Sequence, residues 1–365
     1  MITRRNFLKN TAGLSALCLA GQKLMTPAHA SSSWYVPEEA LPHTRTFMQW
    51  PVNRQVHPDP VFLDMLQNTI ADIANVIAQF EPVVMLMDKS HQTSARRKLS
   101  EDVEIWDMPT DDLWARDSGP MFVIDDDGGL AVSSVNFNGW GNKQPHQNDG
   151  KVAQRIAEIL DIPYLNNGLV GEAGGVDCNG DGILIAHESS WINPNRNRGS
   201  KAEVTRLMQE AFGVDKVIWA PGIWGEDITD YHIDALARFT GPNDILIQLP
   251  EPNDMDDIWV RAAYKTYDIL KAATNLDGAP FNLLTLPGPR HVRSEEEEFV
   301  DSYVNYYVCN DAVIAAQFGD RETDLLAKET LQLSYPDREV ILLDIDPVAE
   351  VGGGIHCATQ QQPLV

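Results

Sequence analysis

An amphipathic helix followed by a short β-branched strand recurs five times in this sequence, and this repeat limits the fold more than any other feature. Apolar residues recur at helical spacing in residues 61–80, 150–160, 201–212, 257–274 and 322–333. The β-branched runs that follow them are residues 83–87, 162–165, 216–219, 281–286 and 340–343. Further strands are predicted in between, such as 121–124 and 130–135, which the turn DDDGG joins. The pattern predicts an α/β fold built from repeated units.

Two α/β architectures are compatible with this repeat. A doubly wound sheet is expected to carry a glycine-rich phosphate loop after its first strand, and the stretch MLMDKSHQTS contains no glycine. Five units around an axis, each mixing a small sheet with a helix, fit the repeat better. The sequence also has no Ser/Gly linker and no low-complexity block, so we expect one domain after the N-terminal segment.

The first thirty residues have the features of a twin-arginine export signal. Residues 3–9 read TRRNFLK, a mildly apolar stretch follows at 12–21, and residues 28–30 form the small-residue cleavage site AHA. The apolar stretch is too short to span a bilayer. We therefore expect an export signal at residues 1–30, a single catalytic domain at 31–365, no membrane contact after cleavage, and a periplasmic or extracellular location.

The mature chain is strongly acidic. The export segment holds four of the 28 basic residues and no acid, which leaves 24 basic against 53 acidic residues and a formal charge of −29. Such a charge repels nucleic acid and anionic lipid and attracts cations, so no nucleic-acid partner is expected. Charge alone does not distinguish a cationic substrate from simple solubility outside the cytoplasm.

Cysteine usage points to a free thiol. The mature chain contains Cys178, Cys309 and Cys357, an odd number, so at least one is free or paired between chains. The twin-arginine route exports folded proteins, and such a chain folds where thiols stay reduced. Cys309 lies in a strand pattern and is interpreted as core, whereas Cys178 lies in a turn and has no evident role.

Four segments concentrate residues that a core or a plain loop would not select. Each supplies an acid, a histidine or a thiol beside glycine or an aromatic residue, near the end of a predicted strand. The segments are WARDSGP (114–120), GEAGGVDCNGDG (171–182), DYHIDALARF (230–239) and GGGIHCATQQ (352–361).

These residues suggest a thiol enzyme that binds a cation. A cysteine nucleophile such as Cys357 needs a base or a positive field. His356 adjoins it in sequence and would point to the opposite face of an extended segment, which leaves His232 as the predicted partner. His232 and Asp234 would share one face of a strand. With Asp117 and Glu172 the site has more acids than a protease needs, and several carboxylates suit a planar guanidinium.

The set of motifs resembles the agmatine deiminase family and the related Porphyromonas-type peptidyl-arginine deiminases, which belong to the guanidino-group-modifying enzymes. The resemblance covers nearly the whole mature chain. Beyond the four segments it includes PEEALPHTRTFMQWP (37–51), FNGWG (137–141) and SYVNYYVCNDAVIAAQFGD (302–320). It implies a five-bladed α/β propeller, the pentein fold, with the active site at its centre.

The resemblance also implies the roles of individual residues. Asp117, Glu172 and Asp234 correspond to carboxylates that bind the guanidinium, His232 to the general acid and base, and Cys357 to the nucleophile. The family's Glu-Gly-Gly-Asn stretch reads Glu-Ala-Gly-Gly here, so Gly175 stands at the asparagine position.

Two further residues complete the predicted substrate-binding set. Trp114 is expected to line the site, and the glycines up to Gly354 are expected to let the guanidinium approach the backbone. The implied mechanism requires no cofactor and no metal.

The predicted function is hydrolytic deimination of a guanidino group to a ureido group through an amidino-cysteine intermediate. The predicted substrate is a small cationic guanidino compound, and agmatine is the first candidate. Its product would be N-carbamoylputrescine, a compound of polyamine metabolism. The alternatives are a peptidyl-arginine or free-arginine deiminase, an amidinotransferase, and a non-catalytic guanidine-binding protein. The sequence allows a structural or a substrate-facing role for Arg116, Lys143 and Arg196. It does not define the oligomeric state.

One competing motif is a twelve-residue calcium loop. Residues 177–188, DCNGDGILIAHE, carry its oxygen ligands and its glycine at the required spacing. An EF-hand needs a helix on each side, and the flanking sequences are not helical. The segment NGDG between apolar runs predicts a β-hairpin turn instead.

Overall fold

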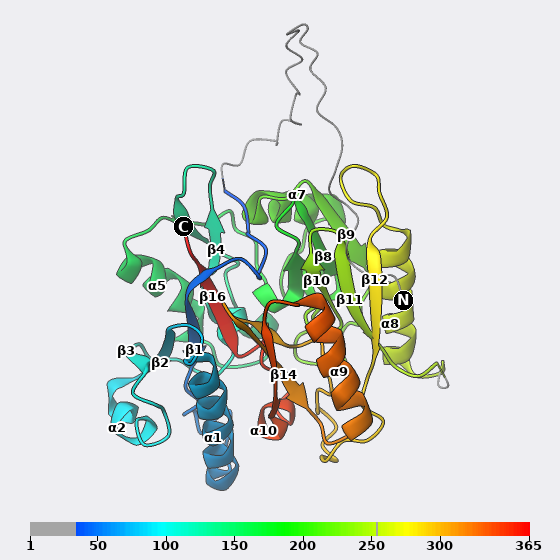
Figure 1. Ribbon diagram of the computed structural model, residues 1–365. Coiled ribbons are helices and arrows are strands. Elements are labelled where there is room, and N and C mark those ends of the chain that lie inside the picture. The colour runs from blue at the N-terminus through cyan, green and yellow to red at the C-terminus, as the bar shows by residue number, and fades with distance from the viewer. Residues whose placement is uncertain (1–33, 253–254) are drawn as a thin grey trace, which may run out of the picture. The chain divides into compact units, whose positions relative to one another are not determined.

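The computed structural model describes residues 34–252 and 255–365 (Figure 1). The predicted export signal lies outside the described residues and stays a prediction. Contacts group Ser32–Val365 into one unit, and it alone is described below. No helix in the described ranges is long and apolar enough to cross a membrane.

The repeated units form five small sheets, each with the same internal order. In every sheet a first strand pairs antiparallel with a second, and the second pairs parallel with a third. Four of the sheets are β4 (Met121–Ile124), β5 (Leu130–Ser133), β6 (Tyr164–Leu165); β7 (Val176–Cys178), β8 (Ile183–His187), β9 (Lys216–Ala220); β10 (Ala237–Gly241), β11 (Asp244–Leu249), β12 (Asn282–Pro287); and β13 (Tyr307–Val308), β14 (Ala312–Gln317), β15 (Glu339–Asp344).

The fifth sheet joins the two ends of the described chain. It contains β16 (Thr359–Pro363), β1 (His43–Gln49), β2 (Val83–Met87) and an added strand, β3 (Val103–Asp107). Figure 1 shows β16, in red, beside β1, in blue. The ring of units is therefore closed by strand pairing rather than by a linker.

A long helix crosses from the second to the third strand of every sheet. These helices are α1 (Pro60–Ile77), α5 (Val152–Leu160), α7 (Lys201–Phe212), α8 (Ile258–Ala272) and α9 (Arg321–Ser334). Their ends follow local chemistry: α7 begins at a capping box in which Ser200 and Glu203 bond each other's backbone N–H, and it ends at Gly213 with φ 63°. Parallel strands need such crossovers.

Short helical turns occupy the connections between these elements. They are η1 (Lys89–His91), α2 (Gln92–Ala95), α3 (Ala115–Ser118), α4 (Gly139–Asn142), η2 (Asp149–Lys151), η3 (Ala173–Gly175), α6 (Glu188–Trp191) and α10 (Asp346–Ala349). Two of these turns position site residues: α3 carries Asp117, and η3 directly follows Glu172.

The prediction of an α/β fold with five repeated units, the five-bladed α/β propeller, is confirmed. All five predicted helices exist, and residues 201–212 and 83–87 match α7 and β2 residue for residue. The strands with the fewest apolar side chains were not predicted. β16, for example, reads TQQQP, yet all five of its residues are buried.

The segments that lead into the five first strands gather the chemistry. We call them the lead-in segments, and they end at β4, β7, β10, β13 and β16. First strands of different sheets contact one another, as β7 does with β10 and β16 with β4. Residues that are far apart in the sequence therefore meet where these strands begin.

Candidate active site

Gly174 marks the point where the predicted site residues converge. A Cβ placed on it would lie 2.7 Å from Asp117 Oδ1, 2.8 Å from His232 Nδ1 and 3.2 Å from Asp234 Oδ2. Its N–H donates to Asp117 Oδ1 at 3.1 Å, and its carbonyl accepts from the N–H of Asp234 at 3.3 Å. Three lead-in segments thus meet around one glycine, and a fourth adds Cys357.

Cys357 is held by two side chains. Its thiol donates to Asp234 Oδ2 at 3.4 Å, and Asn305 Nδ2 donates to its sulfur at 3.1 Å. The residue as a whole is partly exposed. Burial of the thiol and the nearby carboxylates of Asp234 and Asp117 raise its pKa well above the usual range.

His232 lies between two acids. Its Nε2 is 3.3 Å from Glu172 Oε2, and its Nδ1 is 3.7 Å from Asp117 Oδ1. Burial alone would lower its pKa, but the charges of Asp117 and Glu172 outweigh burial and raise the pKa of His232 to about 9. The ring is therefore an imidazolium at neutral pH, the form that a general acid requires.

The strand predicted for residues 232–234 is wrong. The chain is irregular there, β10 begins only at Ala237, and Asp230 and Tyr231 have φ values of 60° and 73°. Non-glycine residues in this region are strained and cluster at functional sites. His232 and Asp234 still face the same glycine, so the predicted proximity holds although its geometric reason does not.

Asp117 is anchored from two sides. Trp140 Nε1 donates to Oδ2 at 2.8 Å, and Gly174 donates to Oδ1. Trp140 belongs to the FNGWG stretch and adopts φ 54°, so this loop is shaped to reach Asp117. Burial raises the pKa of Asp117 to about 6 against the opposing charge of His232, with Glu172 and Asp234 adding to the rise.

Glu172 already has a guanidinium partner, which the sequence did not predict. Arg196 Nε lies 3.0 and 2.9 Å from the two Glu172 oxygens. Arg196 Nη1 donates to Asp230 Oδ2 at 2.7 Å, and Lys143 Nζ reaches the same oxygen at 2.9 Å. Alternating charges thus run from Lys143 near the surface to His232.

Asp234 has one oxygen without a partner. Its Oδ2 accepts from His356 Nδ1 at 2.8 Å, while its Oδ1 is buried and has no hydrogen-bond partner among the described residues. Burial would raise the pKa of Asp234, but the hydrogen bond and charge of His356 prevail and lower it. A buried ionised oxygen without a donor costs free energy unless a ligand supplies one.

Both ring nitrogens of His356 bond carboxylates and not the Cys357 thiol, so His356 is not the partner of Cys357, as predicted. The reason given for that prediction is wrong, because residues 355–358 form a turn and not an extended segment. His356 Nε2 lies 3.0 Å from Glu39 Oε1, and Glu39 also contacts Arg116, at 3.0 Å, and Arg238. His356 therefore ties Asp234 to a buried charge cluster. The sequence does not single out Glu39 and Arg238, because they act only through contacts made in the folded chain.

The glycines of the 352–354 run make room for side chains. A Cβ on Gly353 would lie 2.3 Å from the ring of Trp114, and a Cβ on Gly354 would lie 2.4 Å from Asn305 Oδ1. Trp114 therefore packs beside the cysteine segment. A guanidinium contact with Gly354 or with Trp114 stays a prediction.

The departure at Gly175 also has a local explanation. Its carbonyl accepts from Trp191 Nε1 at 2.9 Å, and a Cβ on Gly175 would lie 2.8 Å from that nitrogen. Gly175 thus faces Trp191, whereas the preceding Gly174 faces the catalytic groups.

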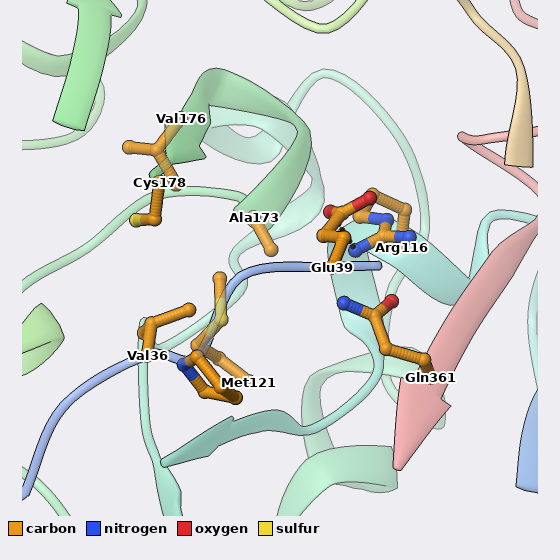
Figure 2. Close-up of a pocket in the computed structure, with 9 residues that line it drawn as sticks. Val36, Glu39, Arg116, Met121, Ala173, Val176, Cys178 and Gln361 are labelled. Atoms are coloured by element: carbon orange, nitrogen blue, oxygen red, sulfur yellow. Dashed lines mark hydrogen bonds and ion pairs between the residues drawn. The ribbon is translucent and has the colours of Figure 1, made fainter. Parts of the chain in front are cut away.

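A small cavity lies beside the charge cluster. Its volume is about 10 Å³, and it is lined by Val36, Pro37, Glu39, Arg116, Met121, Ala173, Val176, Cys178 and Gln361. Figure 2 shows Arg116 and Glu39 together, with Gln361 beside them. Arg116 Nη2 and Gln361 Oε1 have no partner among the described residues, so one water molecule fits this space and its polar wall.

The calcium-loop pattern folds as the predicted hairpin. β7 and β8 pair antiparallel, and Asn179 Oδ1 accepts from the N–H groups of Asp181 and Ile183 in the turn. Asp177 accepts from Arg238 Nε at 2.7 Å and from the N–H of Phe239 at 2.7 Å. The first oxygen ligand of the pattern is therefore engaged in an ion pair.

Comparisons with known proteins identify the family. The sequence profile of the family described as Porphyromonas-type peptidyl-arginine deiminase matches residues 35–363. The agmatine deiminase of Stutzerimonas stutzeri is 32% identical and covers 93% of this chain and 98% of that protein.

Solved structures agree as well. The agmatine deiminase of Enterococcus faecalis superposes with a TM-score of 0.83 at 27% identity, covering 91% of this chain and 96% of that chain. A Cys-to-Ser variant of the C. jejuni agmatine deiminase with substrate bound gives a TM-score of 0.80 at 25% identity and covers 90% and 96%.

Proposed function

Because the chain belongs to the Porphyromonas-type peptidyl-arginine deiminase family, we propose that it hydrolyses a guanidino group to a ureido group with release of ammonia, and that its substrate is agmatine. The product would be N-carbamoylputrescine. Relatives that are named agmatine deiminase and match over nine-tenths of the chain support the choice of substrate.

The observation that carries the proposal is the unpartnered oxygen of Asp234. Asp234 Oδ1 is buried and has no donor in the part of the chain that the structure describes, and the other oxygen of the same carboxylate lies 3.4 Å from Cys357 Sγ. A guanidinium N–H bonded to Oδ1 would satisfy this oxygen and bring the guanidinium carbon beside the sulfur. Charge-assisted bonds of this kind are strong and directional.

The remaining groups supply the chemistry in order. The bound cation offsets the carboxylates and favours the thiolate of Cys357, which attacks the guanidinium carbon. His232 gives its proton to the departing nitrogen. Ammonia is released, and an amidino-cysteine remains on the enzyme. The now neutral His232 takes a proton from water, the hydroxide adds to the same carbon, and the thiolate leaves. The ureido product forms and loses one proton. In the net reaction this proton is taken up by the released ammonia, which becomes ammonium.

Glu172 acts mainly on His232 in this scheme. Arg196 compensates its charge, and its Oε2 faces His232 Nε2. A carboxylate that is already paired with one guanidinium is a poor second ligand for another. We assign the substrate guanidinium to Asp234 and Asp117 and the orientation of His232 to Glu172.

Three basic residues that could have faced the substrate support agmatine over free arginine. Arg116 contacts Glu39, Arg196 contacts Glu172 and Asp230, and Lys143 contacts Asp230. Each has a carboxylate partner, so none of the three is ready to receive the carboxylate of free arginine. A peptidyl arginine lacks that charge, and it remains the alternative substrate.

We expect agmatine to be turned over with a kcat/KM at least about tenfold higher than that of free arginine at low salt, since the acidic chain attracts the dication and opposes the added carboxylate. The gap should narrow as salt screens the long-range part. A purified-enzyme panel with agmatine, arginine and an arginine peptide, scored for ureido product and ammonia, measures this. Equal values, or a preference for the peptide, would favour the alternative.

A bell-shaped pH profile is expected for kcat/KM with agmatine. The acid limb should lie near pH 6, because Asp117 becomes neutral below its pKa of about 6 and stops attracting the guanidinium. The basic limb should lie near pH 9, because His232 loses the proton that ammonia needs above its pKa of about 9. Initial rates from pH 5 to 10 at constant ionic strength test this, and a profile without an alkaline limb contradicts the role of His232.

Export through the twin-arginine route, to the periplasm or the extracellular space, is part of the proposal. It rests on the pattern in residues 3–30. An enzyme in that location would meet agmatine outside the cytoplasm, and its product would need a hydrolase of carbamoyl-amines to give putrescine. Replacing both arginines of the pattern should leave the protein in the cytoplasmic fraction of its host.

A further inference from the structure

One of the five lead-in segments has not yet been given a chemical role. The segments before β4, β7, β10 and β16 supply Asp117, Glu172, the His232–Asp234 pair and Cys357. The fifth, before β13, carries Asn305 two residues ahead of the strand. The side chain of Asn305 contacts the nucleophile, so all five units contribute a polar group to the centre.

The orientation of the Asn305 amide follows from its neighbours. The backbone N–H of Cys357 is a donor in any state, and it lies 3.3 Å from Asn305 Oδ1. The oxygen must therefore face that N–H, which turns Nδ2 toward Cys357 Sγ at 3.1 Å. Asn305 is 1% exposed, and its backbone carbonyl accepts from the N–H of His356 at 3.2 Å. The amide is fixed at both ends.

The contact matters because burial and two nearby carboxylates disfavour a thiolate at Cys357, whereas the backbone at Gly354 and the Asn305 amide favour it through hydrogen bonds. Asp234 lies 3.4 Å from the sulfur, and the charge of Asp117 acts in the same direction. A hydrogen bond to an ionised group in a buried setting is among the stronger ones. The lack of a side chain on Gly354 is what lets Asn305 come this close.

We propose that Asn305 is a catalytic residue that stabilises the thiolate of Cys357 by donating a hydrogen bond to its sulfur. The role rests on the proposed deimination, in which the thiolate appears twice. It forms when the Cys357 thiol loses its proton, before the sulfur attacks the guanidinium carbon, and it re-forms when the carbon–sulfur bond breaks after water has added to the amidino-cysteine. In both steps the negatively charged sulfur accepts a hydrogen bond from the same donor, the Asn305 side-chain N–H.

A purely structural role would use only the oxygen of Asn305, which holds the backbone of Cys357. Two substitutions separate the roles. Asn305→Asp keeps the size and the acceptor but replaces the donor by an oxygen. Asn305→Leu removes donor and acceptor without adding charge. The proposal ranks Asn305→Asp as the more damaging for the thiolate, whereas a structural role ranks Asn305→Leu as the more damaging.

The test is the rate at which iodoacetamide alkylates Cys357 between pH 7 and 10, followed by peptide mass and needing no substrate. We expect Asn305→Asp to slow alkylation at pH 8 by about tenfold or more, as loss of a hydrogen bond to a charged group implies, with Asn305→Leu slowed less. The agmatine kcat should fall in the same order with little change in KM. Unfolding temperatures check that both variants fold.

Asn68→Asp is the matched control. It adds the same charge on the exposed face of α1, where its oxygen accepts from Lys98 Nζ, and it should alkylate like the wild type. Wild-type alkylation of Asn305→Asp, or a slower rate for Asn305→Leu than for Asn305→Asp, overturns the proposal. If the wild type is alkylated but does not turn over agmatine, the proposed substrate is wrong. The role of Asn305 is then decided by the alkylation rates of the two variants alone.

Discussion

Replacing Cys357 by serine will abolish deimination, with a loss of at least about a thousandfold in kcat, because the step that forms the covalent intermediate loses its nucleophile. Cys178→Ser and Cys309→Ser should keep most of the activity. Cys178 and Cys309 are buried, whereas Cys357 is partly exposed and its thiol contacts Asp234, so neither Cys178 nor Cys309 is placed to attack the substrate. Ureido product and ammonia are measured for all three variants.

The covalent intermediate provides an independent readout. Rapid acid quenching of the wild type with agmatine should give an intact mass increased by the amidino group, and peptide mapping should place it on Cys357. The serine variant should show no such adduct. Its unfolding temperature should stay near that of the wild type, since the residue is partly exposed and serine is nearly isosteric. Full activity in Cys357→Ser would remove the basis of the mechanism.

The helix–strand repeat could be predicted from the sequence because local chemistry sets it. The helix at 201–212 has its own capping box and its own αL glycine, so its ends need no tertiary information. β16 could not be predicted in this way. Its run TQQQP is polar, and it is a strand because β1 supplies its hydrogen-bond partners and the surrounding sheets bury it. Such a strand has no hydrophobic period of its own.

The site residues also fall into two groups, those that the local sequence reveals and those that only the folded chain reveals. Cys357, His232 and the three carboxylates could be predicted, because reactive side chains beside glycine in loops are unusual in a sequence. Asn305, Arg196 and Glu39 could not, because an amide, an arginine or a glutamate is common in any chain. One signal for Asn305 was available: the segment before β13 is the fifth repeat of a position that already held acids, a histidine and a thiol.

Alanine at Gly174 will cost about a hundredfold or more in kcat/KM while the protein still folds. The added methyl would lie 2.7 Å from Asp117 Oδ1 and 2.8 Å from His232 Nδ1, closer than a Cβ is ever found to such atoms. These side chains cannot step aside, because Trp140 holds Asp117 and Glu172 faces His232. A displacement of about 1 Å in such groups is enough for a loss of this size.

The loss should come from displaced side chains and not from backbone strain. The φ of Gly174 is outside the left-handed region, so alanine can adopt the same backbone, and overpacking of this kind costs about 1–3 kcal/mol of stability. Gly241→Ala is the matched control, since its Cβ would meet only Asp244 Oδ2 at an ordinary 3.5 Å. Kinetics and thermal unfolding are measured for both. Wild-type kcat/KM in a folded Gly174→Ala protein would mean that Asp117, His232 and Asp234 are not held together around this glycine during turnover, and the arrangement on which the mechanism depends would have to be abandoned.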